Sequence, residues 1–302
     1  MKYQKILIVV SLLFTPFIWL FGQDYINLAR LSYNISNDNT FDLGVGETNL
    51  KELSSDVNIP IPLSAKKTFL TGFLYENIQL QLYPHDEYIT LHTVNLKVGM
   101  NQKFSNNWDV TYMVLPKFSS DLIKWGKDDF QIGALALFKK KIKKDFNYKF
   151  GMFYNSDKFG PFVTPLIGIY YRKGKWETNM TLPASADGNY SFSKNGKIGL
   201  RFDGAIRSFN LNSSFEGKDQ YVRRSNNELS GYLQWNMKGV NLQFQVGSSI
   251  GRNYRTYEKS DEVDLTVSFF KFGSFDQQLN EDFSDGMFFK TTLLYQLNLR
   301  NK

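Results

Sequence analysis

Strict alternation of apolar and polar side chains is the feature that most limits how this chain can fold. Between Glu228 and Met237 one face carries Leu229, Gly231, Leu233, Trp235 and Met237. After Lys238 and Gly239 the alternation resumes, and this apolar face carries Val240, Leu242, Phe244 and Val246. A period of two residues is typical of a strand, and the two central turn residues predict a hairpin.

The second face of this hairpin is composed mostly of Gln, Asn, Ser and Gly, whereas a soluble sandwich usually exposes Lys and Glu. Such a face suits a confined, water-filled lumen. If the apolar face contacts lipid, the sheet must close on itself, because unpaired backbone groups in hydrocarbon cost several kcal/mol each. The pattern therefore predicts an all-β fold, an antiparallel transmembrane β-barrel of the outer-membrane type.

Segments with the same alternation recur along the chain and number about 14, with about 12 as the next choice if the pieces near Pro60 or Tyr190 do not pair. Short links near Ser64, Ser105, Lys139, Arg172, Lys194 and Lys238 alternate with mostly longer ones. This rhythm is typical of outer-membrane barrels. Residues 212–227 read as a polar loop, and a phase slip near Gly204 predicts a β-bulge.

The N-terminal residues predict export. Lys2 and Lys5 precede the apolar run Ile6 to Phe21, so we expect a signal peptide at residues 1–22 and a barrel domain at residues 23–302. An uncleaved anchor is the alternative. The expected location is the outer membrane, with lipid as a partner; aromatic residues, 16% of the chain, fit girdles at the two membrane interfaces.

Charge and cysteine content exclude several classes. The formal charge of +7 is mild and dispersed, so no nucleic-acid partner is expected. The chain has no Cys, which excludes disulfides, thiolate metal sites and cysteine nucleophiles. The sequence indicates no particular oligomeric state.

The chain also resembles a family of Bacteroidota outer-membrane β-barrels of unknown function. The resemblance covers most of the mature chain and rests on segments 151–154, 159–162 and 165–170, on Trp176, Leu182-Pro183 and Tyr190-Ser-Phe192, and on the signal-like ending Phe21-Gly22-Gln23. It implies location and fold, and it implies no catalytic residues.

Candidate catalytic groups are sparse. Residues 247–251 match the pattern G-x-S-x-G around Ser249, but they continue a strand pattern without the following helix of a hydrolase. His85 lies in a predicted loop beside carboxylates and lacks a second nitrogen ligand. An outer-membrane lipid hydrolase using His92 and a Ser remains the third hypothesis. We otherwise expect no enzyme activity, metal or cofactor, and we expect the Lys-rich run 139–144 and the acidic group Glu281, Asp282 and Asp285 to be solvated.

The most informative polar residues are those that face inward in the predicted barrel. They can line a water-filled path, or they can pair with one another across the lumen and plug it. We therefore expect a non-enzymatic pore for small solutes, with a plugged structural or surface-interaction barrel as the alternative. The candidate lumen-lining residues are Lys97, Asp109, Gln131, Lys149, Glu177, Arg201, Asp203, Glu228, Gln234, Gln243, Gln245, Lys290 and Gln296.

Overall fold

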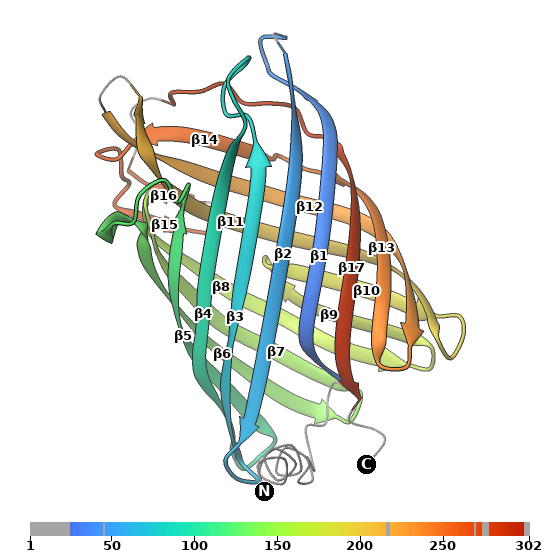
Figure 1. Ribbon diagram of the computed structural model, residues 1–302. Coiled ribbons are helices and arrows are strands. Elements are labelled where there is room, and N and C mark those ends of the chain that lie inside the picture. Colours follow the sequence, from blue (N-terminus) through green and yellow to red (C-terminus); the bar gives the residue numbers. More distant parts are fainter. Residues whose placement is uncertain (1–24, 45, 216–217, 269, 274–277, 299–302) are drawn as a thin grey trace, which may run out of the picture.

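The fold is a closed antiparallel barrel (Figure 1). The computed structural model describes residues 25–44, 46–215, 218–268, 270–273 and 278–298, so the predicted signal peptide, residues 1–22, lies outside the described residues. Its elements are β1 (Tyr25–Thr40), β2 (Glu47–Pro62), β3 (Lys67–Leu80), β4 (Ile89–Lys103), β5 (Trp108–Ser120), η1 (Lys127–Asp129), β6 (Phe130–Lys143), β7 (Phe146–Asp157), β8 (Gly160–Lys173), β9 (Trp176–Leu182), β10 (Ser185–Ser191), β11 (Gly196–Phe215), β12 (Lys218–Met237), β13 (Val240–Ser249), β14 (Asn253–Glu258), β15 (Leu265–Val267), β16 (Phe270–Phe272) and β17 (Met287–Asn298).

Fourteen of these strands form the wall. Each of β1 to β12 pairs with the next strand, β13 pairs with β17, and β17 pairs back with β1, from Tyr25 opposite Asn298 to Ile35 opposite Phe289. β14 pairs with β12, and the β15–β16 hairpin adds to β8. The predicted barrel and its preferred strand number are both confirmed. None of the described residues belongs to a helix long and apolar enough to cross a membrane.

The predicted apolar face lies on the outside of the barrel. Leu229, Leu233 and Trp235 each expose almost half of their surface. The inward neighbours Ser230, Gln234 and Gln243 are buried. Because water would not stabilise such a continuous apolar exterior, this outer surface suits contact with acyl chains.

Prolines near the end of β2 do not break the sheet. Pro60 and Pro62 pair with Leu70 and Thr68 of β3. The pairing of β2 with β1 extends only as far as Val57, so the prolines occupy a stretch where the other side of β2 needs no donor.

The two ends of the barrel differ. At one end, which we call the turn end, short connections such as residues 63–66, 144–145 and 238–239 join the strands, and β1 begins where β17 finishes. At the opposite, loop end lie the connections 81–88 and 121–129 and the segment 250–286, which carries β14, β15 and β16. Figure 1 shows β14 crossing near this end.

Two predictions about the loop end are wrong. Residues 212–227 are mostly strand, because β11 and β12 are 20 residues long each. Their register is continuous from Gly196–Trp235 to Leu211–Gln220, so the pair has no bulge at Gly204. The prediction of a loop failed because polar side chains in this region form hydrogen bonds with other protein groups. Asn210 donates to Asp129 at 2.8 Å, and Asn212 donates to Asp121 at 3.0 Å.

Candidate functional site

A cationic mouth opens at the turn end. It is a cavity of about 910 Å³ whose lining includes five cationic side chains and one acidic one, Glu177. The strand ends and short turns place these cations around the opening, because each turn is polar and projects past the wall. The cationic lining consists of Arg172, Lys175, Lys194, Lys197 and Lys238.

A narrower cavity of about 210 Å³ lies next to the mouth. The two cavities share Tyr25, Lys197, Gln234 and Gln296 in their linings. Amide side chains are paired here: Asn241 donates to Gln296 at 2.6 Å and Gln296 donates to Asn27 at 2.7 Å. The lining is therefore polar and hydrogen-bonded, and it also carries the charged side chains Arg30, Asp187, Lys197 and Arg201.

The central cavity, of about 290 Å³, is rich in charge. It shares Arg30 and Arg201 with the narrower cavity. Its lining holds five cationic and five acidic side chains, so its formal charges balance. The charged residues are Arg30, Glu52, Asp56, Glu76, Arg201, Asp203, Arg207, Arg224, Glu228 and Lys290.

Most of these charges form ion pairs inside the lumen. Arg224, which is buried, contacts Glu52 at 2.8 Å and Glu76 at 2.9 Å, and Glu76 also pairs with Arg207. Arg224 thus links β12 to β2 and β3, strands with which β12 does not pair in the sheet. Removing one member of such a buried group leaves the others without compensation, which makes the network a structural element as well as a lining.

Further pairs complete the central lining. Lys290 pairs with Glu228, and Arg201 contacts Asp203 at 2.6 Å. None of the described ion pairs or side-chain hydrogen bonds involves Arg30, although it borders two cavities. Arg30 is thus a cation that a passing anion can approach.

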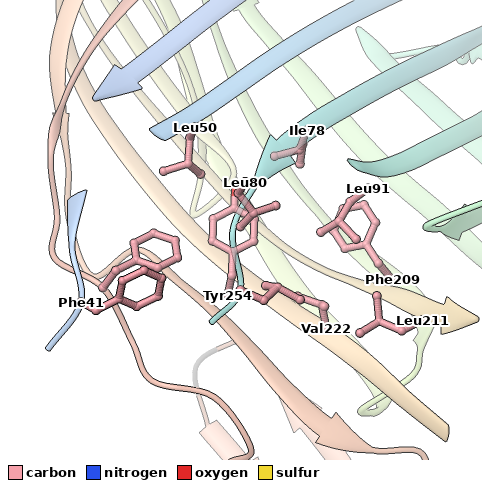
Figure 2. Close-up of a cluster of buried hydrophobic side chains, with 11 residues drawn as sticks. Phe41, Leu50, Ile78, Leu80, Leu91, Phe209, Leu211, Val222 and Tyr254 are labelled. Atoms are coloured by element: carbon pink, nitrogen blue, oxygen red, sulfur yellow. The ribbon is translucent and has the colours of Figure 1, made fainter. Parts of the chain in front are cut away.

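A hydrophobic plug fills the loop end of the lumen. Ile78 and Leu80 from β3 pack with Phe209 from β11, and all three are almost fully buried. Burying such side chains contributes about 1.5–3 kcal/mol each. The plug, shown in Figure 2, consists of Phe41, Leu50, Ile78, Leu80, Leu82, Leu91, Phe209, Leu211, Val222, Tyr254 and Phe283.

The upper halves of β11 and β12 carry the plug into the lumen. The pairing of β11 with β10 ends at Asp203. Farther on, Asn210 bridges to Ser120 of β5. Ser208 secures this crossing: its N–H and hydroxyl donate to Asp157 at 3.0 and 2.9 Å. Beyond Asp203 β11 therefore leaves the wall and divides the interior, and we call its upper half together with that of β12 the partition.

The departure of β11 leaves a side gap in the wall. The short hairpin β9–β10 reaches only to the turn 183–184, and β8 pairs with β9 only from Ile167 onward. The gap is bounded by residues 164–166 of β8, by the end of β15 and Ser268, by the turn 183–184 and by residues 204–207 of β11. On its β8 edge Pro165 has no backbone N–H to donate, as is usual for strand edges.

An apolar chamber of about 430 Å³ lies behind this gap. Its wall is formed by inward side chains of three neighbouring strands, namely Leu135 and Leu137 of β6, Phe153 of β7 and Leu166 of β8. Ile206 of the partition closes it from inside. The chamber and the central cavity share Ala184, Gly204, Ala205 and Arg207 in their linings, so only this thin part of the partition separates them.

The predicted lumen-lining residues are distributed over these cavities. Arg201, Asp203, Glu228, Gln245 and Lys290 line the central cavity, and Glu177, Gln234, Gln243 and Gln296 line the narrower cavity or the mouth. The other four make internal contacts: Lys97 with Asp56 at 2.5 Å, Asp109 with Lys139 and Lys141, Gln131 with Ser208, and Lys149 with Asn179. Whether the set lines a solute path stays a prediction.

The chamber and the plug were missed at the sequence level. The sequence signal of the chamber is the loss of alternation: the runs 132–138 and 162–171 are almost entirely apolar on both faces. The plug residues lie outside these runs. A strand is apolar on both faces when its outer face contacts lipid and its inner face lines an apolar chamber, as is usual for buried strands.

The residues of the hydrolase hypothesis have separate partners. His92 contacts Tyr75 at 3.1 Å and Asn77 at 3.3 Å, whereas the hydroxyl of Ser249 bonds to Gly286. The two therefore form no dyad.

Several of the charged groups that were expected to be solvated have protein partners, whereas Lys143 and Lys144 are exposed as expected. Asp282 pairs with Arg255 at 2.5 Å. Asp285 accepts backbone hydrogen bonds from Gly251 and Arg252. Lys139 and Lys141 point inward to the buried Asp109. Within the described ranges no group of three His, Cys, Asp or Glu side chains could hold a metal ion.

Comparison with known proteins identifies a family. A family model described as "Domain of unknown function (DUF6268)" matches residues 29–295. No curated protein matches the sequence. Among solved structures, an outer membrane channel from Pseudomonas putida F1 is 8% identical over 94% of this chain and 99% of its own, with a TM-score of 0.48.

Two further barrels are similar at a lower level. A mutant of the TodX monoaromatic hydrocarbon channel is 6% identical over 90% of this chain and 91% of its own, with a TM-score of 0.39. The NanC porin is 8% identical over 89% of this chain and 100% of its own, with a TM-score of 0.34. These likenesses concern the barrel fold.

Proposed function

The chain belongs to the DUF6268 family, whose domain has no known function, and we propose that it is a non-enzymatic outer-membrane channel for small organic anions. The apolar exterior, the closed sheet and the predicted signal peptide support the location. The observation that carries the channel is the series of three polar cavities that share lining residues from the mouth to the middle of the barrel.

The preference for anions follows from the charge of this series. The mouth holds five cationic side chains against one acidic one, and Arg30 stands at the junction of the two inner cavities. A concentration of one sign of charge in a low-dielectric channel attracts the opposite sign. The ion pairs of the central cavity leave this excess uncompensated, because they neutralise one another.

The plug favours a second candidate, a sealed structural barrel. Its buried side chains fill the loop end, so a solute that passes through must move the plug or enter elsewhere. In the sealed barrel the polar interior would serve only to hold the wall together.

Reconstitution into liposomes separates the two candidates. We expect protein-dependent efflux of small monocarboxylates that exceeds the efflux of neutral and cationic molecules of similar size. A barrel that forms, as judged by heat-dependent gel mobility, and yet leaves liposomes sealed to every solute rejects the channel and supports the sealed barrel.

Charge reversal at the mouth tests the anion preference. Lys197→Glu together with Lys238→Glu should lower the ratio of anion to cation flux severalfold, since both side chains line the mouth. Lys66→Glu together with Lys67→Glu is the matched control, because both side chains are exposed at the same end of the barrel and do not line the mouth. An equal change in the control would assign the effect to overall charge.

A further inference from the structure

We propose that the side gap is a lateral portal through which the hydrocarbon group of a small membrane-dissolved molecule enters the apolar chamber. This inference rests on the channel proposed above for its exit route, and it adds the entrance and the substrate class. The juxtaposition that carries it is an apolar chamber directly behind an interruption of the barrel wall.

The height of the gap places it within the acyl-chain region. The exposed Trp176 begins β9 at the turn end, where an aromatic girdle is expected, and the turn above β9 starts at Pro183. A strand rises about 3.3 Å per residue and tilts by roughly 40°, so seven residues climb about 18 Å of an apolar band about 25 Å tall. The lower border of the gap therefore lies above the middle of this band.

The outer surface beside the gap is also apolar. Ile167 of β8 exposes 64% of its surface and Leu200 of β11 exposes 67%. Both lie on the outside of the barrel near the lower border of the gap. Tyr154 of β7, which pairs with Val163 of β8, marks the upper border of this apolar surface. Lipid therefore reaches the gap from both sides.

Backbone groups at the borders of the gap are hydrogen-bonded. Residues 162–163 of β8 pair with β15, and the N–H of Ser268 donates to the carbonyl of Val163 at 2.7 Å. On the opposite border the N–H of Gly204 donates to Ala184 at 2.9 Å. These bonds satisfy backbone groups that an interrupted wall would otherwise leave unpaired in hydrocarbon.

The chamber accepts a hydrocarbon group and directs the polar end inward. Leu135, Leu137 and Phe153 offer apolar surface, which is an unusual lining for the inside of an outer-membrane barrel. At its inner end Arg207 borders the chamber and the central cavity. A carboxylate attached to the hydrocarbon group would then face the central cavity, where Arg30 has no ion pair among the described residues.

Photocrosslinking in liposomes tests the portal directly. The probe is a medium-chain carboxylate with a photoreactive diazirine on its hydrocarbon chain, added to the lipid before illumination. We expect crosslinks to the inward residues Leu135, Leu137 and Phe153, which excess octanoate removes. Octanol should compete as well if the hydrocarbon group dominates binding, whereas acetate should not. Crosslinks confined to outward residues such as Ile167 would overturn the proposal.

A space-filling variant and a matched control sharpen this experiment. Ala205→Trp places a large ring in the thin part of the partition and should reduce labelling of the chamber about tenfold. A tenfold reduction corresponds to a loss of about 1.4 kcal/mol of binding free energy. Ala134→Trp makes the same change on the exposed outer face of β6 and should leave labelling unchanged. Unchanged labelling in Ala205→Trp contradicts the portal.

The remaining outcomes are also decisive. If Ala205→Trp forms no barrel, Ala184→Trp at the lower border of the gap replaces it. Efflux without labelling of the chamber rejects the portal and leaves the channel standing. Labelling of the chamber without efflux of any solute rejects the channel and leaves a hydrocarbon-binding site.

Discussion

The two halves of the lumen differ in the way they are stabilised. In the half formed by β1 to β3 and β11 to β17, charged side chains such as Arg224 and Glu76 neutralise one another in ion pairs. In the half formed by β6 to β8, Leu135, Leu137 and Leu166 line a chamber instead. The partition lies between them. One barrel therefore encloses a polar and an apolar environment, and each responds differently to the same substitution.

Removing a charge from the polar half should have the largest effect. Arg224→Met should destabilise the barrel by about 3–5 kcal/mol, because Glu52 and Glu76 would lose their buried partner. Denaturant unfolding in lipid, followed by heat-dependent gel mobility, measures the change. Arg201→Met serves as a comparison, since Arg201 is less buried and contacts only Asp203 among the described ion pairs. Equal losses in the two variants would contradict the special role of the Arg224 network.

Truncating the plug should have the next largest effect. Phe209 is fully buried in the partition, and Phe209→Ala should cost about 3 kcal/mol through lost contacts and a cavity. It should also raise single-channel conductance, because the plug closes the loop end. A destabilised barrel with unaltered conductance would mean that the plug does not control passage.

Introducing a charge should discriminate the two halves. Leu137→Glu should cost about 2 kcal/mol, because the apolar chamber offers the carboxylate few hydrogen-bond partners. Gln243→Glu, in the polar half, should cost less than Leu137→Glu, because the new carboxylate still accepts the hydrogen bond that Gln245 donates at 2.7 Å and loses only the bond that Gln243 donates to Gln234. Similar costs at both positions would show that the two halves of the lumen do not differ in polarity.

Lowering the pH should have the smallest effect. Burial alone would raise the pKa of Asp285, beside the polar half, but the backbone N–H groups of Arg252 and Gly251 hold this pKa below its usual value. A hydrogen bond from Lys259 lowers the pKa of Asp128, beside the apolar half. A lowered pKa in the folded state stabilises the protein above the usual pKa of Asp, near 4, and this contribution disappears as the pH falls through the lowered value.

Both carboxylates are largely exposed to water, so each should contribute less than about 1 kcal/mol. Denaturant unfolding at pH 7 and at pH 3 measures this contribution for the protein and for Asp285→Asn and Asp128→Asn. Each variant should lose less stability than the protein does between the two pH values. An identical pH dependence in all three would show that these loops are not anchored by ionised carboxylates.

The site was predictable where polar and apolar residues alternate. Gln234 and Gln243 stand out because each lies between outward apolar neighbours, and both line a cavity. Leu135 does not stand out, because its outward neighbours Ala134 and Ala136 are also apolar. Alternation reports which side chains share a face, but it is silent on the environment inside when both faces are apolar.

The sequence by itself determined the barrel, because a period of two residues with an apolar outer face has a stable solution in lipid only when the sheet is closed. It also determined the preferred number of strands and the contrast between short turns and longer connections. Only the tertiary structure decided that β11 leaves the wall after Asp203. Its polar residues find partners on β5, β6 and β7, which are distant in sequence, and local pattern cannot encode such contacts. The plug, the side gap and the apolar chamber all follow from that one departure.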